Sequence, residues 1–146
     1  MSNTKCHIIQ LDSLEDGVTL HVHLWPTKNA IGWVHIMHGM SEHGGRYDGL
    51  AKVLNSEGFN VSAGDHRGHG LTGKAANTLG HLANQNGWNK VVVDQAEIIT
   101  HLQQQWSQPL TILGHSMGSF LATRVAQRYA KKLANQLQGL VLSGSN

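Results

Sequence analysis

The chain has 146 residues, enough for one ordinary domain or part of one, and no stretch of it marks a linker or a second core. Its formal charge of +2 and its 14% of charged residues are mild, and the Lys131-Lys132 pair is the largest cluster of basic side chains. A nucleic-acid-binding surface is therefore not expected.

The cysteine content and the first residues bear on the cellular compartment. Cys6 is the single cysteine, which excludes an internal disulfide and predicts a free, buried thiol in a reducing compartment. Residues 1–5 are polar and lack the basic start and apolar run of a signal peptide. No apolar run approaches membrane-spanning length. These features predict a cytoplasmic protein.

The chain opens with the pattern of a β-hairpin. Residues 7–11 and 18–25 alternate apolar and polar side chains around the turn signal Glu15-Asp16-Gly17. His21 and His23 lie two apart on one face of the second strand. No third ligand accompanies them at a recognisable spacing, so we expect an exposed strand face and no metal site.

Strands and helices alternate through the rest of the chain. Residues 71–86 are rich in Gly, Asn and Thr and predict a loop that could include one helical turn. The apolar spacing predicts strands over residues 31–37, 59–63, 110–113 and 140–142, and helices over residues 47–54, 88–106 and 119–133, with Gly58 and Pro109 ending the first two helices.

This alternation predicts an α/β fold with a mostly parallel sheet, helices on both faces and an antiparallel N-terminal hairpin. Ligands in such sheets bind at the carboxyl ends of the strands. Gly39, Asp65 and Ser116 each lie at or just beyond such an end. We therefore expect these residues to gather on one rim of the sheet.

The most informative stretch is Gly114-His115-Ser116-Met117-Gly118, which follows the expected strand at residues 110–113. A serine on a sharp turn from strand to helix exposes its hydroxyl, and glycines on either side let the helix pass close to the strand. This is the setting of a nucleophile elbow.

Three motifs occur in order: His38-Gly39-Met40-Ser41-Glu42-His43-Gly44-Gly45-Arg46-Tyr47, then Asp65-His66-Arg67-Gly68-His69-Gly70, then the elbow. Together they resemble the α/β-hydrolase family, and within it the monoacylglycerol lipase and lysophospholipase-like branch, a serine aminopeptidase S33-type domain. The resemblance covers nearly the whole chain. It implies that residues 1–146 are the N-terminal part of a single α/β-hydrolase domain, without its C-terminal strands, lid and helices.

The resemblance also implies roles for individual residues. Ser116 would be the nucleophile that forms an acyl-enzyme. The oxyanion hole would consist of the backbone N–H groups of Met40 and Met117. The remaining motif positions would support this geometry, and they are His38, Gly39, Gly114, His115 and Gly118.

Each of these roles has a simpler alternative. Ser116 could be an ordinary cap at a helix N-terminus, and His38 and Gly39 could be a strand end that satisfies its hydrogen bonds. The run that begins at Asp65 is expected to be structural, with Asp65 and Arg67 bonding local backbone or each other. The side chains of the consecutive residues His115 and Ser116 are expected to point in different directions, so His115 is not expected to be the base that takes the proton of Ser116.

In the family the partners of the serine follow it in the order Ser, then Asp or Glu, then His. Residues 117–146 contain no Asp, no Glu and no His. We therefore expect the acid and the histidine in a missing C-terminal half, and the chain alone to be inactive. The last strand, at residues 140–142, would then be an unpaired apolar edge.

The expected function is hydrolysis of carboxylic esters, similar to monoacylglycerols or lysophospholipids, with no cofactor and with a peripheral contact to lipid. A peptidase or thioesterase on the same scaffold is an alternative, because the elbow and the oxyanion hole serve any acyl transfer. A non-catalytic, truncated relative is another. An ester hydrolase and a non-catalytic relative would differ in whether the reading frame continues past Asn146 into an Asp and then a His.

Overall fold

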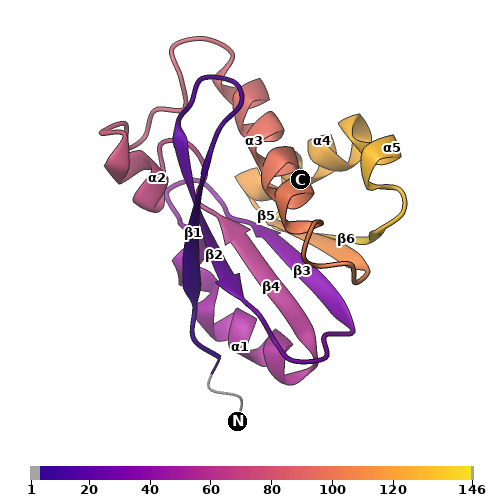
Figure 1. Cartoon of the computed structure of the whole chain (residues 1–146). Coiled ribbons are helices and arrows are strands. Elements are labelled where there is room, and N and C mark those ends of the chain that lie inside the picture. The colour runs from indigo at the N-terminus through magenta and orange to yellow at the C-terminus, as the bar shows by residue number, and fades with distance from the viewer. Residues whose placement is uncertain (1–3, 146) are drawn as a thin grey trace.

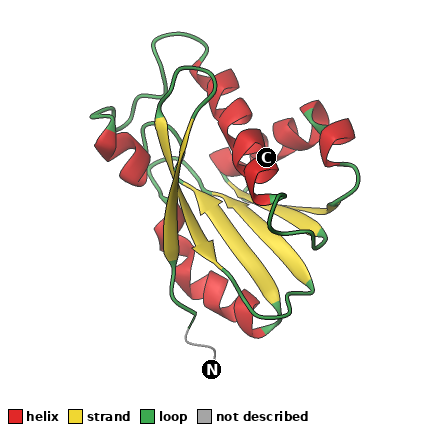
Figure 2. Ribbon diagram, in the orientation of Figure 1, coloured by secondary structure: helices red, strands yellow, loops and turns green. Residues whose placement is uncertain are grey.

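The computed structural model describes residues 4–145 and shows a twisted sheet with helices on both faces (Figure 1, Figure 2). The strands follow the order β1-β2-β4-β3-β5-β6 across the sheet. They are β1 (His7–Asp12), β2 (Thr19–Trp25), β3 (Gly32–Met37), β4 (Phe59–Gly64), β5 (Leu110–His115) and β6 (Leu137–Ser143).

The hairpin predicted at the start of the chain is confirmed. β1 pairs with β2 in antiparallel register, with His7 opposite Leu24, and β2 continues antiparallel onto β4. The pairs β3 with β4, β3 with β5 and β5 with β6 are parallel. The carboxyl ends of the parallel strands therefore meet at one rim, where ligands bind in such sheets.

Helices form a layer on each face of the sheet (Figure 2). On one face α1 (Asp48–Ser56), which follows the 3-10 turn η1 (Gly44–Tyr47), covers a small core around Trp25 and Ile36. On the other face α3 (Gly87–Leu102) and α4 (Met117–Arg128) cover the larger core. Apolar side chains of Ile98, Leu121 and Ile112 meet in that core.

Two helix boundaries differ from the sequence prediction. The helix expected over residues 88–106 ends at Leu102, although Trp106 still packs edge-on against Trp33 with ring centroids 5.5 Å apart. The helix that the elbow predicts to begin near Met117 does start at Met117, but the helical stretch expected to run to residue 133 is interrupted at Tyr129 before α5 (Ala130–Leu133). The loop expected over residues 71–86 opens with the short helix α2 (Gly70–Ala75).

Strand β6 forms one edge of the sheet and pairs only with β5 among the described residues 4–145. Three consecutive apolar side chains of β6 are exposed, Leu140 by 41%, Val141 by 48% and Leu142 by 43%. An apolar strand with a free edge invites further pairing. No helix within the described part of the chain is long and apolar enough to span a bilayer.

Arg67 connects the turn after β4 to the hairpin and to α3. Its side chain is 2% exposed and donates to Asp16 at 2.8 Å through both terminal nitrogens and to Asp94 through Nε at 2.5 Å. Ser13 accepts a further bond from Arg67 at 2.9 Å. Arg67 was expected to bond local backbone or Asp65, and both alternatives are wrong, because its guanidinium binds Asp16, Asp94 and Ser13 instead.

Burial raises the pKa of Asp94, although its bonds to Arg67 and Ser13 oppose the shift. The pKa of Asp16 is lowered instead, chiefly by its hydrogen bonds to Arg67, because this carboxyl is more exposed. The same guanidinium thus offsets the cost of burying one carboxylate and stabilises a second at the surface.

The change Arg67→Met should lower the free energy of unfolding by about 3–5 kcal/mol, because it leaves the Asp94 carboxyl buried without its cation. Lys90→Met is the matched control, since Lys90 also binds Asp16, at 3.1 Å, but from a partly exposed position. The control should cost about 1 kcal/mol or less. Urea unfolding of the full-length gene product measures both, and equal losses in the two variants would contradict this account.

Candidate active site

Ser116 lies on the turn between β5 and α4 in a backbone conformation that a non-glycine residue rarely adopts. Its φ is 52° and its ψ is −120°, and its side chain is exposed. A residue held in such a region costs on the order of 1–3 kcal/mol and persists only where its surroundings impose it. The geometry is that of a serine raised on a nucleophile elbow.

The two glycines of the elbow are required by the close approach of α4 to the sheet. A Cβ on Gly118 would lie 2.6 Å from the carbonyl oxygen of His38, and it would also overlap the Met37 carbonyl. A Cβ on Gly114 would lie 2.7 Å from the carbonyl carbon of Gly118. Any side chain at either position would push the helix away from β3 and β5, so both predicted support roles have a steric basis.

Two serines that the sequence analysis did not single out hold the elbow in place. The carbonyl oxygen of Ser116 accepts bonds from the backbone N–H of Ser119 at 2.8 Å and from its hydroxyl at 2.6 Å. On the other side, the N–H of Ser116 donates to the carbonyl of Ser143 at 2.8 Å. The i to i+3 spacing of Ser116 and Ser119 could have predicted their contact from the sequence. The contact with Ser143 could not be predicted in this way, because it depends on β6 lying beside β5.

The loop after β3 reaches the elbow. A Cβ on Gly39 would lie 3.3 Å from the Cβ of Ser116 and 3.3 Å from the carbonyl oxygen of His115. The structure therefore brings two of the predicted motifs into contact, as the rim argument expected. The backbone N–H groups of Met40 and Met117 donate to no group among residues 4–145.

Glu42 closes this loop onto itself, a contact that the sequence analysis missed. Its Oε2 accepts from the backbone N–H of Gly39 at 2.6 Å and from the Tyr47 hydroxyl at 3.1 Å, and its Oε1 lies 3.1 Å from Arg46 Nη1. Burial would raise the pKa of Glu42, but these bonds outweigh it and hold the pKa below its ordinary value. Burial and the neighbouring carboxylate raise the pKa of Tyr47 to about 12.

His38 is not free to act as a general base. The ring is fully buried, and its two nitrogens lie 2.8 Å from the carbonyl oxygen of Gly39 and 3.0 Å from the backbone nitrogen of His66. Burial lowers the pKa of His38 to about 4. His115, which the sequence analysis did not expect to be the base, places Nδ1 3.1 Å from the Ser143 hydroxyl.

The turn that follows β4 carries structural bonds, as predicted for Asp65. Its Oδ1 accepts from the N–H of Gly44 at 2.6 Å and lies 3.1 Å from His23 Nε2, and its Oδ2 accepts from the N–H of Leu71 at 2.8 Å. Asp65 thus connects the loop after β3 to α2. Although burial opposes the shift, these bonds hold the pKa of Asp65 below its ordinary value.

The expectation that His21 and His23 lie on an exposed strand face is wrong. Their exposed fractions are 8% and 6%. Strand β2 is an interior strand, and α2 and η1 cover it: Thr72 accepts from the N–H of His21 at 2.9 Å, and a Cβ on Gly44 would lie 2.7 Å from the His23 ring. Cys6, expected to be buried, is only half-buried.

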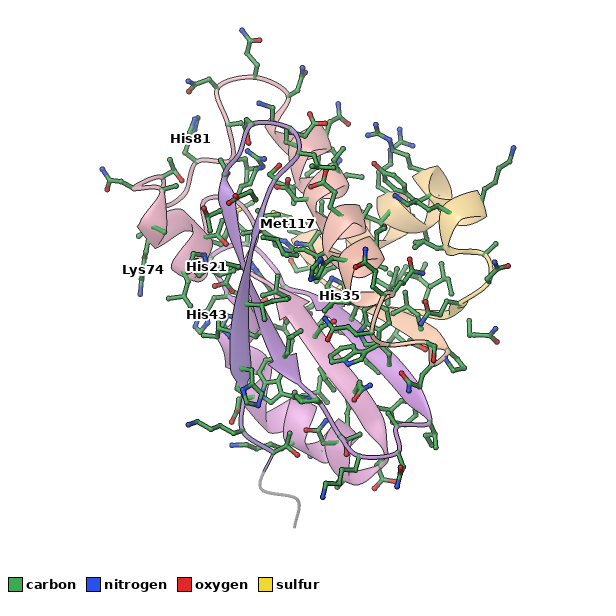
Figure 3. All side chains as sticks on the ribbon, in the orientation of Figure 1. His21, His35, His43, Lys74, His81 and Met117 are labelled. Atoms are coloured by element: carbon green, nitrogen blue, oxygen red, sulfur yellow. The ribbon has the colours of Figure 1, made fainter. Side chains whose placement is uncertain are left out.

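Two cavities are lined in part by Glu42 of the loop after β3, and Ser116 lines neither of them. One, of about 520 Å³, lies between the loop after β3 and α2 and is lined by His43 and Lys74, whose side chains lie on the same side of the molecule (Figure 3). The other, of about 390 Å³, is bordered by Tyr47, Leu50 and Ser143. Within residues 4–145 no three His, Cys, Asp or Glu side chains are grouped as a metal site requires.

Comparison with known proteins identifies the family to which this chain is similar. The family model described as serine aminopeptidase, S33, matches residues 28–146. The monoacylglycerol lipase of Mycolicibacterium smegmatis is 31% identical over 130 residues, which cover 88% of this chain and 43% of that protein. The phospholipase YtpA of Bacillus subtilis is 30% identical over 120 residues, which cover 82% of this chain and 42% of that protein.

Solved structures show the same relation. A thermostable carboxyl esterase from Bacillus coagulans superposes with a TM-score of 0.87 at 26% identity, covering 99% of this chain and 46% of the esterase. The chain thus spans less than half the length of these relatives and covers only part of the α/β-hydrolase fold. By its sequence, its sheet and its elbow, the chain belongs to the serine aminopeptidase S33 family of α/β-hydrolases.

Proposed function

We propose that the protein containing this chain is a serine hydrolase that cleaves carboxylic esters similar to monoacylglycerols or lysophospholipids. The observation that carries the proposal is the juxtaposition of the exposed Ser116, at a φ of 52°, with the loop whose Met40 N–H has no partner within residues 4–145. Two relatives named as a monoacylglycerol lipase and a phospholipase support the choice of substrate.

In the proposed reaction the Ser116 hydroxyl oxygen attacks the ester carbonyl, and the carbonyl oxygen becomes an oxyanion. The N–H groups of Met40 and Met117 donate to that oxyanion, and the N-terminus of α4 adds its positive dipole end. The tetrahedral intermediate then breaks its bond to the leaving oxygen, which takes up the proton removed from Ser116 and departs as the alcohol. Water hydrolyses the resulting acyl-enzyme to the free acid and restores the Ser116 hydroxyl. Donors fixed in advance cost no reorganisation when the charge develops.

A base must take the proton from the Ser116 hydroxyl, and residues 117–146 supply no Asp, Glu or His. We propose that the acid and the histidine come from sequence beyond Asn146, in a C-terminal half that also shapes the acyl pocket. The length of the relatives, more than twice the matched segment, supports this.

Esters similar to monoacylglycerols or lysophospholipids imply a peripheral contact of the protein with lipid. The lone Cys6 thiol supports a reducing, cytoplasmic location.

A peptidase is the second candidate, because the matching family is described as serine aminopeptidase. The same elbow and oxyanion donors would serve an amide or a thioester. Parallel assays with a monoacylglycerol, an aminoacyl anilide and an acyl thioester separate these activities. Turnover of the anilide or the thioester in preference to the ester would replace the proposed substrate class, and no turnover of any would favour a non-catalytic role.

The nucleophile assignment is tested in the full-length gene product with a fluorophosphonate. Ser116 should be the single labelled residue, because its hydroxyl alone is raised on the elbow. Ser116→Ala should lose on the order of 10⁴-fold or more in turnover. Ser107→Ala, at an exposed serine before β5, is the control that should keep its activity. A label mapped to another residue, or ester hydrolysis that survives Ser116→Ala, would refute the assignment.

The Met40 assignment concerns a backbone group, since the Met40 side chain is 69% exposed. Met40→Pro removes the N–H and should lower kcat on the order of a hundredfold or more. Met40→Leu keeps the N–H and should cost little. Both variants are compared for kcat and for circular dichroism. If the proline variant folds normally and retains full turnover, the second oxyanion donor lies elsewhere.

Residues 1–146 expressed alone should not turn over esters, because the Ser116 hydroxyl has no base. The same preparation should associate, because the free β6 edge exposes Leu140, Val141 and Leu142. Sedimentation velocity and hydrolysis of a short-chain ester measure the two effects. A soluble monomer with turnover that Ser116→Ala abolishes would show that an upstream histidine acts as the base, and His43, which is exposed, would then be the one to replace.

A further inference from the structure

The two peptide groups that flank Gly39 are held at every polar atom except one. The His38 carbonyl lies 2.9 Å from His66 Nε2, and the Gly39 N–H donates to Glu42 Oε2 at 2.6 Å. The Gly39 carbonyl lies 2.8 Å from His38 Nδ1 and accepts a longer bond from the Glu42 N–H at 3.4 Å. The remaining atom is the Met40 N–H. Because a peptide group is planar, fixing the Gly39 carbonyl also fixes the direction of the Met40 N–H.

The neighbouring backbone determines which nitrogen of His38 carries the proton. The N–H of His66 donates to His38 Nε2 at 3.0 Å, so Nε2 must be the unprotonated nitrogen. A neutral ring then carries its proton on Nδ1, and that N–H donates to the Gly39 carbonyl. The ring is neutral because burial lowers the pKa of His38 to about 4.

The tautomer of His66 is determined in the same way. Its Nε2 faces the His38 carbonyl, which only accepts, so Nε2 carries the proton. Its Nδ1 accepts from the side-chain amide of Gln95 at 3.0 Å. The rings of His38 and His66 lie with centroids 3.8 Å apart, and burial holds the pKa of His66 well below its ordinary value. Gln95 therefore fixes the ring that in turn supports the His38 carbonyl.

The hydrogen bonds continue into the core. Gln95 Oε1 accepts from His35 Nε2 at 2.9 Å, His35 Nδ1 accepts from the Ser62 hydroxyl at 2.7 Å, and Ser62 accepts from Trp33 Nε1 at 2.8 Å. The His35 side chain lies inside the molecule, where the sheet meets α3 (Figure 3). Gly64 leaves room for the amide, since a Cβ there would lie 3.1 Å from Gln95 Nε2. After Trp33, each of these side chains accepts a bond from the one before it and donates to the next. The donors therefore all point the same way, from Trp33 toward the His38 carbonyl.

We propose that this buried chain of bonds is a positioning device for the oxyanion hole, in which His38 orients the Met40 amide and His66 and Gln95 hold His38. The inference rests on the proposed ester hydrolysis, because only then does the Met40 amide meet an oxyanion. These side chains do not touch the reacting atoms. They are positioning residues, and their effect is to keep the Met40 N–H directed outward before the substrate arrives.

A purely structural role is the rival explanation, since the bond between His38 Nε2 and the His66 N–H also joins the loop after β3 to the turn after β4. The two ring nitrogens of His38 distinguish the positioning role from the structural one, because Nδ1 binds the Gly39 carbonyl and Nε2 binds the His66 N–H. His38→Asn can place an amide nitrogen at the Nδ1 position and keep the donor to Gly39. His38→Gln places its amide at the Nε2 position and keeps only the acceptor for His66.

Both variants are made in the full-length gene product, and kcat and KM are measured with a monoacylglycerol. The proposal expects kcat of His38→Gln to fall about tenfold or more below that of His38→Asn, with similar KM values, because misdirecting one oxyanion donor weakens transition-state binding. The opposite order, or equal values of kcat, would mean that His38 only joins the two loops and would overturn the proposal.

Asn55→Leu is the matched control for the loss of a buried polar side chain. Asn55 is 3% exposed and donates to the carbonyls of Trp25 and Phe59, at the far end of β4 from the loop. This variant should unfold more readily and keep the kcat of the unchanged protein. A loss of kcat in Asn55→Leu equal to that in His38→Gln would assign both losses to general destabilisation and would refute the positioning role.

A spectroscopic test needs no turnover and no variant that must stay active. In long-range ¹H–¹⁵N spectra of the ¹⁵N-histidine-labelled protein at neutral pH, His38 should carry its proton on Nδ1, and His35 and His66 should carry theirs on Nε2. A His38 proton on Nε2 would overturn the proposal whatever the enzyme does. If Ser116→Ala still hydrolyses esters while these tautomers are observed, the proposed reaction fails and the ordering of the loop stands.

Discussion

The close approach of α4 to the end of β3 is the constraint on which the site depends. Only a glycine at position 118 allows it, because a Cβ there would overlap the carbonyl of Met37 and lie 2.6 Å from that of His38. This approach brings the elbow beside the loop that leaves β3. Ser116 and Gly39 come from distant parts of the sequence, yet their Cβ positions would lie 3.3 Å apart. With the helix displaced, the serine and the Met40 amide could not serve one carbonyl group.

Two polar networks secure the turn after β4 from opposite sides. Arg67 binds it to the hairpin and α3 through Asp16 and Asp94. The adjacent His66 binds it to the loop after β3 through its own N–H and ring. Buried polar groups are costly unless all are satisfied. Here the buried groups of Arg67 and His66 have hydrogen-bond partners on other elements of the fold, which offset the cost of burying them. The same bonds hold the turn after β4 rigidly against its neighbours.

The polar side chains near the oxyanion loop are either neutral or paired with other groups. Burial keeps the rings of His35, His38 and His66 neutral, so they contribute fixed dipoles and no titrating charge. The carboxylate of Glu42 is paired with Arg46 and accepts a hydrogen bond from the N–H of Gly39. Within residues 4–145 the Met40 and Met117 amides donate to no group, so they are the donors available to the proposed oxyanion. Preorganised donors of this kind are the largest single contribution in many acyl transfers.

The sequence by itself determined the element types, the hairpin and the elbow, because these follow from short-range signals: alternation of apolar residues, turn glycines and the Gly-x-Ser-x-Gly spacing around Ser116. It also placed Gly39, Asp65 and Ser116 on one rim, because parallel strands share the direction of their ends. It failed at His21 and His23, where periodicity identified a strand face but could not show that α2 would cover it.

Only the tertiary structure decided how the polar side chains pair. Arg67 was expected near Asp65 in the sequence but binds Asp94, 27 positions away, and Gln95 reaches His66 across 29 positions. Such partners carry no local pattern, since a long side chain bonds whichever group the packed sheet and helices bring within about 3 Å. The sequence thus determines which segments form and where the strands end, whereas the identity of each hydrogen-bonded partner emerges when the layers pack.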